Sequence, residues 1–170
     1  MNNYNQEKSK LVNSVFDRVY KKYDLMNDIM SFGVHRIWKK NLVSWMNPQQ
    51  GNKIIDVASG TGDLAKIISQ KNNNQNSIYC IEPNQGMFDT GEKKLRYLKN
   101  IKWHLCPAEK LPFEDDTFDF YTISYGIRNV TDINKCLKEA FRVLKPGGQF
   151  LCLEFSKVEN EILNLFYQNY

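Results

Sequence analysis

Paired cysteines and long apolar runs are both absent from this 170-residue chain, and their absence argues against several classes of protein. The four cysteines are scattered without a C-x-x-C pair, which indicates a reduced, intracellular protein with core cysteines. No apolar run approaches the ~20 residues that span a bilayer. The N-terminus lacks the apolar core of a signal peptide. These features predict a cytoplasmic protein that is at most peripheral at a membrane.

A strong excess of charge is also absent. The chain has 23 Lys and Arg against 19 Asp and Glu, and this net charge of +4 is too weak to indicate a nucleic-acid partner. No cluster of residues has the spacing of metal ligands, so we expect no bound metal. The length suits one compact unit with a sizeable core.

The stretch from Ile54 to Ala65 is the centre of the chain. It begins with a short apolar run, Ile54–Val57, that suits a strand buried on both faces. A tight turn follows over Ala58–Gly62, and a helix opens at Asp63. Glycines let the backbone bend sharply and let a ligand approach closely, and a helix N-terminus favours anions. The stretch therefore predicts a cofactor-binding loop at the carboxyl end of a central parallel strand.

The spacing of this loop bears on which cofactor it binds. The pattern is not G-x-G-x-x-G and has no Lys after the second Gly, so neither a dinucleotide fingerprint nor a P-loop fits. A nicotinamide-dependent oxidoreductase is therefore disfavoured. The pattern Asp-x-Ala-x-Gly-x-Gly over residues 56–62 resembles motif I of S-adenosylmethionine (SAM)-dependent methyltransferases. An ordinary strand-to-helix turn with two glycines is the alternative at this point.

The next predicted strand, Ser77–Glu82, ends in an acid. A carboxylate at this position, Glu82, can accept two hydrogen bonds from ribose hydroxyls. A helix is expected from Pro83 and Asn84 to about Leu98, followed by a third strand over Ile101–Leu105.

The N-terminal 46 residues predict two helices. Leu11, Val15, Val19 and Tyr23 recur at helical spacing, and a second helix runs from about Val34 to Met46 after a break at Gly33. Their many amphipathic and aromatic side chains suit a cap over an apolar substrate, although a plain packing pair of helices fits the pattern as well.

Residues 23–38 carry a sharper signal. The run Tyr-Asp-x-Met-Asn-x-x-Met-Ser-x-x-x-His-Arg-x-Trp is similar to the N-terminal signature of the ubiquinone/menaquinone biosynthesis C-methyltransferases, the UbiE type. Its fixed positions are Tyr23, Asp24, Met26, Asn27, Ser31, His35 and Trp38. The run Ser-x-Gly-x-Arg-Asn over residues 124–129 and the segment Arg142–Ser156 resemble the same family.

The resemblance implies a set of site residues. Arg128 follows the carboxyl end of the fourth strand, where it either contacts substrate or forms a surface ion pair. His35 is a weaker candidate for the quinol pocket. Pro107 stands where the family has an Asn that contacts adenine, and it offers neither an amide side chain nor an N–H, so that contact must differ. The implied cofactor contacts are Asp56, Ala58, Gly60, Thr61, Gly62, Glu82, Pro107, Ala108 and Ser124.

The implied fold is α/β and Rossmann-like, with parallel strand order 3-2-1-4-5. The fourth strand is expected at Phe118–Ser124, a helix from about Asp132 to Val143, and the fifth strand at Phe150–Phe155 after a Pro146–Gly148 turn. Residues 1–50 are predicted to form a helical cap and 51–170 the SAM-binding unit, with a final helix near 162–170. The family's C-terminal antiparallel strand pair is expected to be missing, which leaves the fifth strand exposed.

The implied reaction is SAM-dependent C-methylation of a polyprenylated benzoquinol or naphthoquinol, namely 2-methoxy-6-polyprenyl-1,4-benzoquinol and/or demethylmenaquinol. The implied partners are this quinol, a membrane surface or quinone-biosynthesis complex, and a second copy of the chain. No residue identifies itself as the general base. The alternatives are an inactive SAM-binding or scaffold protein of such a complex, and a methyltransferase for another small lipid-like acceptor.

Overall fold

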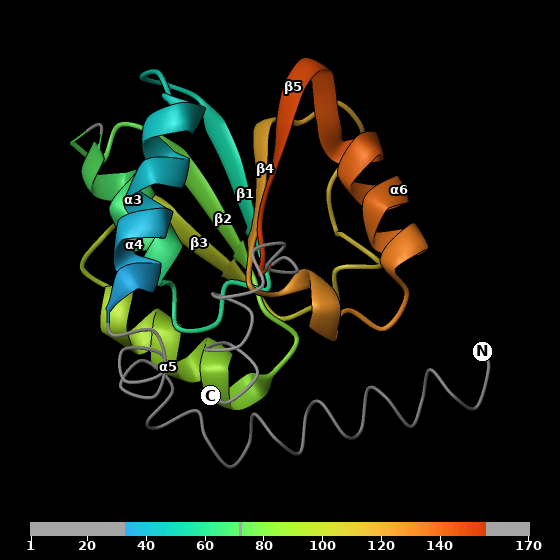
Figure 1. The fold of residues 1–170 in the computed structure, drawn as a ribbon, viewed down its shortest axis with the longest axis horizontal. Coiled ribbons are helices and arrows are strands. Elements are labelled where there is room, and N and C mark those ends of the chain that lie inside the picture. Colours follow the sequence, from blue (N-terminus) through green and yellow to red (C-terminus); the bar gives the residue numbers. More distant parts are fainter. Residues whose placement is uncertain (1–32, 72, 156–170) are drawn as a thin grey trace, which may run out of the picture.

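A five-stranded parallel sheet forms the centre of the computed structural model, which describes residues 33–71 and 73–155 (Figure 1). The order β3-β2-β1-β4-β5 confirms the predicted 3-2-1-4-5 order. The strands are β1 (Lys53–Val57), β2 (Ser77–Ile81), β3 (Ile101–His104), β4 (Phe118–Ser124) and β5 (Leu144–Leu153). The helices are α3 (Val34–Met46), α4 (Asp63–Lys71), α5 (Gln85–Leu95), α6 (Ile133–Val143) and the short 3-10 helix η2 (Ile127–Asn129).

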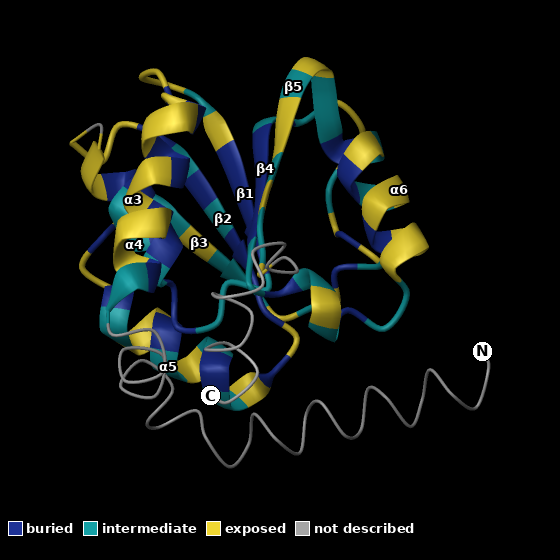
Figure 2. Cartoon of the chain, in the orientation of Figure 1, coloured by how far each residue is buried: buried dark blue, intermediate teal, exposed yellow. Residues whose placement is uncertain are grey.

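The sheet separates two apolar cores because successive side chains of a strand point to opposite faces. On β1, Ile54 packs with α3 and α4, whereas Ile55 and Val57 pack with α6. Figure 2 shows the inner strands β1, β2 and β4 mostly buried, the edge strands β3 and β5 more exposed, and the outer sides of the helices exposed. The first core contains Leu42, Val43 and Met46 from α3 and Leu64, Ala65 and Ile68 from α4. The second contains Cys136, Ala140 and Val143 from α6.

Two helices begin where the sequence places polar caps. The Asn84 side chain accepts a hydrogen bond from the Met87 N–H at 3.0 Å and starts α5. The Asp132 side chain accepts from the Lys135 N–H at 3.1 Å and starts α6. Each cap satisfies one of the N–H groups that lack a partner in the first turn. The caps fix where the helices leave the carboxyl end of the sheet.

The Pro146–Gly148 segment differs from its prediction as a helix-to-strand turn. Strand β5 begins directly after α6 at Leu144, which pairs with Phe118, and pairing resumes with Gln149 opposite Phe120. The intervening residues form a bulge. A Cβ at Gly148 would lie 2.9 Å from the Lys145 carbonyl oxygen, so glycine is needed there for close approach of the backbone. The prediction that β5 spans Phe150–Phe155 is therefore wrong at both ends.

Helix α3 belongs to the predicted cap, yet it packs into the same core as α4. The boundary between residues 1–50 and 51–170 stays a prediction. The predicted helices around residues 11–23 and 162–170 lie outside the described residues. The structure holds all four cysteines as free thiols, two of them buried, and the reduced, intracellular assignment stays a prediction. Among the described residues, no helix has the length and apolar character needed to cross a membrane.

Candidate active site

The loop after β1 turns sharply because three of its residues adopt left-handed backbone angles. Ala58, Gly60 and Gly62 have φ values of 53°, 57° and 82°. The Gly62 N–H donates to the Ser59 carbonyl at 3.0 Å, and the Ser59 N–H donates to the Ile81 carbonyl at the end of β2, also at 3.0 Å. These bonds hold the loop against the neighbouring strand. The predicted cofactor loop is thus a rigid turn at the carboxyl end of the sheet.

Gly62 is also required by close packing. A Cβ on Gly62 would lie 2.6 Å from Leu95 Cδ1 and 3.0 Å from the Trp103 indole. Gly91 on α5 also lies against this indole, and a Cβ built on it would lie 2.2 Å from the ring. Because neither glycine has a side chain, the Trp103 indole can pack directly against the loop.

Glu82 is bound to this loop by its side chain. Oε2 accepts a hydrogen bond from the Gly60 N–H at 2.8 Å, and Oε1 accepts from the Asn84 N–H at 3.0 Å. The side chain is buried, and burial raises the pKa of Glu82 to about 7, although the two backbone N–H groups act to lower it. Each oxygen retains acceptor capacity, so the carboxylate can accept further hydrogen bonds from a diol.

Asp56 lies at the base of the loop, on the same face of the sheet as α3 and α4. Its Oδ1 accepts a hydrogen bond from the Thr122 hydroxyl on β4 at 2.8 Å. Its Oδ2 is buried and has no hydrogen-bond partner among the described residues. Burial raises the pKa of Asp56 to about 6, while the Thr122 hydroxyl and the Lys39 ammonium act to lower it. A buried open acceptor of this kind marks a place for a polar or cationic ligand group.

Asp63 joins three helices beside the loop. Its carboxylate lies 2.8 Å from Lys94 Nζ on α5 and 3.7 Å from Lys39 Nζ on α3. Burial acts to raise the pKa of Asp63, but these two cations and Arg36 outweigh it, and the pKa falls below its usual value. The negative charge also suits the first turn of α4. The loop is therefore anchored by α3 and α5 as well as by the sheet.

The segment after β4 touches the loop directly. A Cβ on Gly126 would lie 2.5 Å from Ala58 Cβ, so only glycine permits this approach. Ser124 Oγ is buried without a hydrogen-bond partner among the described residues, next to this contact in sequence. Tyr125 has a φ of 56°, and its N–H donates to the Leu153 carbonyl at 2.7 Å. The ends of β1, β4 and β5 thus meet in one place.

Arg128 forms an ion pair across the ends of β4 and β5. Its NH1 group lies 2.5 Å from Glu154 Oε1, and its guanidinium lies 5.4 Å from the centre of the Phe155 ring. The Phe155 ring stacks on Tyr125 at 4.8 Å and meets Trp38 of α3 edge-on at 6.1 Å. Arg128 therefore has an ionic partner, as the surface interpretation held, but this partner lies beside the cofactor loop.

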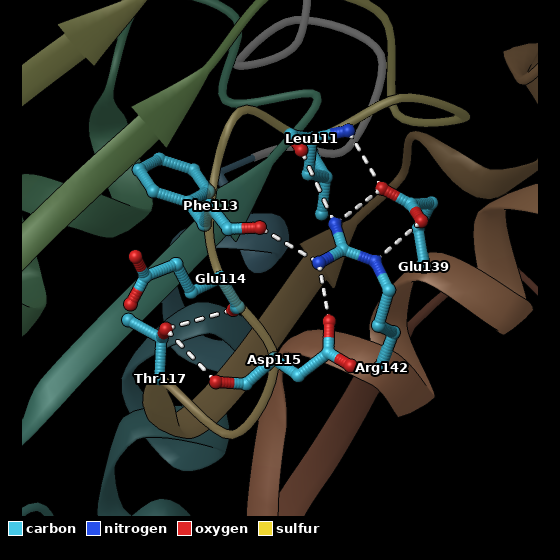
Figure 3. A network of polar contacts seen from close by, with 7 residues as sticks. All are labelled: Leu111, Phe113, Glu114, Asp115, Thr117, Glu139 and Arg142. Carbon is cyan, nitrogen blue, oxygen red and sulfur yellow. Dashed lines mark hydrogen bonds and ion pairs between the residues drawn. The ribbon is translucent and has the colours of Figure 1, made fainter.

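The loop that carries Pro107 and Ala108 is fixed by Arg142 (Figure 3). The Arg142 guanidinium donates to the Phe113 carbonyl at 2.7 Å and to the Leu111 carbonyl at 3.2 Å. The same group donates to Glu139 and Asp115. Ala108 is buried in the core on the α6 side, whereas Pro107 is exposed. A contact between Pro107 and a cofactor stays a prediction.

His35 lies in α3, with 3% of its surface exposed. It precedes Trp38 by one helical turn, and α3 packs against β5. A role of His35 in the reaction stays a prediction. The other fixed positions of the N-terminal signature, Tyr23, Asp24, Met26, Asn27 and Ser31, lie outside the described residues.

Comparison with known sequences decides the family. The profile of the "ubiE/COQ5 methyltransferase family" matches residues 1–170. The chain belongs to this family. The "Ubiquinone/menaquinone biosynthesis C-methyltransferase UbiE" of Rickettsia bellii (strain OSU 85-389) is 50% identical over an alignment that covers 96% of this chain and 68% of the relative. The protein of the same name from Rickettsia prowazekii (strain Madrid E) is 49% identical over the same shares.

Solved structures agree on the fold of this ubiE/COQ5 family member. A SAM-dependent methyltransferase from Aquifex aeolicus superposes with a TM-score of 0.66 at 22% identity, covering 72% of this chain and 66% of that one. The [4+2]-cyclase SpnF superposes with a TM-score of 0.73 at 21% identity, covering 88% and 62%. These likenesses show the fold alone, because one fold hosts different reactions.

The residues of this ubiE/COQ5 chain fit SAM at the loop. The Glu82 carboxylate can accept hydrogen bonds from ribose hydroxyls, and Asp56 Oδ2 offers an open acceptor for a cationic group. Sequence reasoning brought Asp56, Glu82 and Ser124 to one end of the sheet and missed Thr122, which orients Asp56. It also assigned no role to Tyr125 and Glu154, whose only signal was their place at the carboxyl ends of β4 and β5.

Proposed function

We propose that this chain is a C-methyltransferase that uses SAM to methylate the ring of a polyprenylated benzoquinol or naphthoquinol. The supporting observation is the contact between two parts of the site. The glycine loop after β1, with Glu82 hydrogen-bonded to it, touches the segment after β4 at Ala58 and Gly126. That segment carries Arg128, so a methyl donor on the loop and an acceptor beside Arg128 would be neighbours. The similarity to proteins named UbiE gives the substrate class.

Two groups of residues have different roles, because one group binds the cofactor and the other binds the acceptor. SAM, when bound, supplies an electrophilic methyl group on a sulfonium. Asp56, Thr61 and Glu82 would hold it in place, and the burial of these three side chains would limit competition from water. The Arg128 guanidinium stabilises negative charge on a quinol oxygen, which raises the electron density of the neighbouring ring carbon. Alignment of carbon and methyl supplies much of the rate enhancement.

Methyl transfer to a short-chain demethylmenaquinol tests this proposal. Purified protein, SAM and the reduced quinol should give a product one methyl group heavier, detected by mass spectrometry. The variant Arg128→Ala should lower turnover by about 10²-fold or more and leave affinity for S-adenosylhomocysteine within about two-fold. If the wild-type chain binds S-adenosylhomocysteine but methylates no quinol, the scaffold alternative replaces the proposal.

The ubiquinone and menaquinone precursors are distinguished in cells. A strain without this gene should accumulate the unmethylated precursor of its quinone, and mass spectrometry of the lipid extract identifies which ring it carries. The precursor should disappear when the gene is restored. An unchanged quinone profile would contradict a role in quinone biosynthesis and favour another lipid-like acceptor.

We also propose that the protein works as a cytoplasmic enzyme peripheral at a membrane, where a polyprenyl quinol resides. Support comes from a groove between α5 and β3, which is lined by apolar residues that include Leu98 and Trp103. The charged residues that line it are the cations Lys93, Arg96, Lys99 and Lys102 and the single acid Glu92. A predominantly basic groove with apolar surface suits anionic headgroups. Association with other biosynthetic proteins and between copies of the chain stays a prediction at this stage.

Vesicle binding tests the membrane proposal. Vesicles of phosphatidylglycerol should retain the protein and vesicles of phosphatidylcholine should not. The double variant Lys93→Ala, Arg96→Ala should weaken binding by about 2 kcal/mol, roughly 30-fold. The matched pair Lys135→Ala, Lys138→Ala on α6 should change it little. Equal loss in both double variants would mean that net charge alone governs binding.

A further inference from the structure

Three buried polar atoms lie without hydrogen-bond partners at the ends of β4 and β5 in the described part of the chain. They are Ser124 Oγ, Tyr125 Oη and Glu154 Oε2. The strands are neighbours, with Ser124 in register with Leu153. A buried polar atom without a partner costs about 1–3 kcal/mol. The cost is relieved if a ligand with a hydroxyl group completes the site.

The two oxygens of Glu154 have different surroundings. Oε1 faces the Arg128 guanidinium at 2.5 Å and accepts from the Phe155 N–H at 3.0 Å. Oε2 is the buried oxygen without a partner. The carboxylate is therefore held in position by one oxygen and left open at the other. This arrangement orients an acceptor for a proton from a ligand.

Tyr125 complements this acceptor. Burial, together with the Glu154 carboxylate, raises the pKa of Tyr125 to about 12, so its hydroxyl stays protonated and can donate. A ligand hydroxyl placed between the two side chains would accept from Tyr125 and donate to Glu154. Arg128 adds a positive charge beside the same position.

Two aromatic rings, Phe155 and Trp38, adjoin this polar group. Phe155 stacks on Tyr125 at 4.8 Å, and Trp38 of α3 meets Phe155 edge-on. Gly126, next to Tyr125, touches Ala58 of the cofactor loop. A planar aromatic ligand with a hydroxyl group fits both the rings and the open acceptor, and it would lie beside the methyl donor.

We propose that Glu154 is the general base that removes the hydroxyl proton of the acceptor ring. This inference rests on the proposed quinol methylation. The O–H bond breaks, the proton passes to Glu154 Oε2, and the electron pair stays on the quinol oxygen beside Arg128. The ring carbon then forms a bond to the methyl group as the carbon–sulfur bond of the donor breaks, with its electron pair left on sulfur. The ring C–H proton leaves to water, and Glu154 returns its proton to the oxygen.

Other titratable groups surround Glu154 and must stay constant in the test. Arg128, Tyr125 and Cys152 interact with it, and α3, which packs against β5, carries His35, Arg36 and Lys39. Lys39 is paired with Asp63. The test therefore compares variants that differ only in the charge at residue 154.

The probe is 4-nitrophenol, whose phenolate absorbs visible light, bound in the presence of S-adenosylhomocysteine. In Glu154→Gln the bound probe should ionise at a pH lower by about one to three units than in the wild type, because the negative charge of Glu154 is removed while the Arg128 cation remains beside the probe. If Glu154 merely held Arg128 in place, the substitution would release the cation and raise that pKa instead. Glu114→Gln, an exposed residue near the start of β4, is the matched control and should change nothing.

Methyl transfer supplies the second measurement. Glu154→Gln should lower kcat about 10²–10⁴-fold with S-adenosylhomocysteine affinity unchanged, while Glu154→Asp should keep the carboxylate and part of the rate. If the wild type methylates the quinol and Glu154→Gln is equally active, Glu154 is not the general base. The proposed function then still stands. A wild-type chain that binds S-adenosylhomocysteine but neither probe nor quinol overturns both. Thermal melting establishes that each variant is folded.

Discussion

At the scale of single residues, the site is dominated by two buried carboxylates that hold protons more tightly than usual. Asp56 and Glu82 lie at the ends of neighbouring strands, and burial raises their pKa values to about 6 and about 7. The Asp56 charge also contributes to the raised pKa of Glu82. Ligands that stabilise the ionised forms therefore bind best at pH values at which these two carboxyl groups are deprotonated.

This arrangement predicts a pH-dependent affinity for S-adenosylhomocysteine. Ribose hydroxyls donate to the ionised form of Glu82, so below its pKa of about 7 a proton must leave before binding. The affinity should rise up to about tenfold per pH unit between about pH 5 and pH 7 and level off above that range. Isothermal titration measures it. Glu82→Gln should weaken binding by about 1.5–3 kcal/mol at pH 8 and flatten the profile. A wild-type affinity that is constant over this range would remove Glu82 from the cofactor site.

The left-handed glycines provide a second residue-level prediction. Gly62→Ala introduces both an unfavourable φ of 82° and a contact of 2.6 Å with Leu95, whereas Gly51→Ala introduces only the φ of 84° with no atom within 4 Å. The strain costs about 1–2 kcal/mol at either position, and overpacking adds about 1–3 kcal/mol at Gly62 alone. Urea denaturation should therefore show Gly62→Ala as clearly the less stable variant. Equal loss of stability at both sites would mean that the loop moves away from Leu95 and Trp103 without cost.

At the scale of elements, α6 and the loop before β4 are joined by a network centred on one side chain, Arg142. Arg142 satisfies the carbonyls of Leu111 and Phe113 while it pairs with Glu139 and Asp115 (Figure 3). Glu139 in turn accepts from the Leu111 N–H at 2.7 Å. This network replaces regular secondary structure between β3 and β4, where the chain must pass over the core.

Loss of Arg142 should therefore destabilise the fold more than loss of an ordinary surface cation. Arg142→Ala leaves two carbonyls without their donor and should cost about 1–3 kcal/mol in urea denaturation. Arg142→Lys should recover only part, because one ammonium cannot reproduce the planar set of donors. Lys135→Ala is the control, since Lys135 is 60% exposed and lies 3.5 Å from Asp132, and it should cost no more than about 0.5 kcal/mol. If Arg142→Ala costs no more stability than Lys135→Ala, water replaces the hydrogen bonds of the network.

Sequence reasoning anticipated the elements better than the contacts between them. The predicted fourth strand, Phe118–Ser124, agrees with β4 because apolar β-formers and a preceding turn define it locally. The predicted start of β5 is wrong because the strand already begins at Leu144, which pairs with Phe118. The bulge that follows leaves no periodic pattern of apolar residues in the sequence. The hydrogen bond from Thr122 to Asp56 spans 66 positions and the pair of Arg128 with Glu154 spans 26, and spacing alone does not predict such contacts.

At the scale of the whole molecule, the helix that covers one side of the sheet, α6, leaves apolar side chains exposed. Helix α6 buries Cys136, Ala140 and Val143 against the core, and an apolar stripe beside this buried face stays exposed. There Ile133, Leu137 and Phe141, four residues apart and so on one stripe, are 42%, 40% and 86% exposed. Phe150, on the neighbouring β5, is 38% exposed. Figure 2 shows the exposed outer side of α6 beside β5. Contiguous apolar surface of this kind marks an interaction site.

We predict that two copies of the chain associate through this stripe. An isologous contact between two such helices would bury Phe141 of both copies, and removal of an aromatic anchor costs about 2–4 kcal/mol, a roughly 30- to 1000-fold weaker dimer. Light scattering after size-exclusion chromatography should report a dimer for the wild type and a monomer for Leu137→Lys, Phe141→Lys at matched concentrations. Trp45→Lys is the control, because Trp45 is 79% exposed but lies on α3, and it should leave the dimer intact. A wild type that stays monomeric at every concentration, or a Trp45→Lys variant that dissociates as readily, would show that the stripe is not the contact. The thermal midpoint distinguishes dissociation of the dimer from unfolding of the subunit. Replacing exposed side chains should dissociate the dimer while each folded subunit keeps its core.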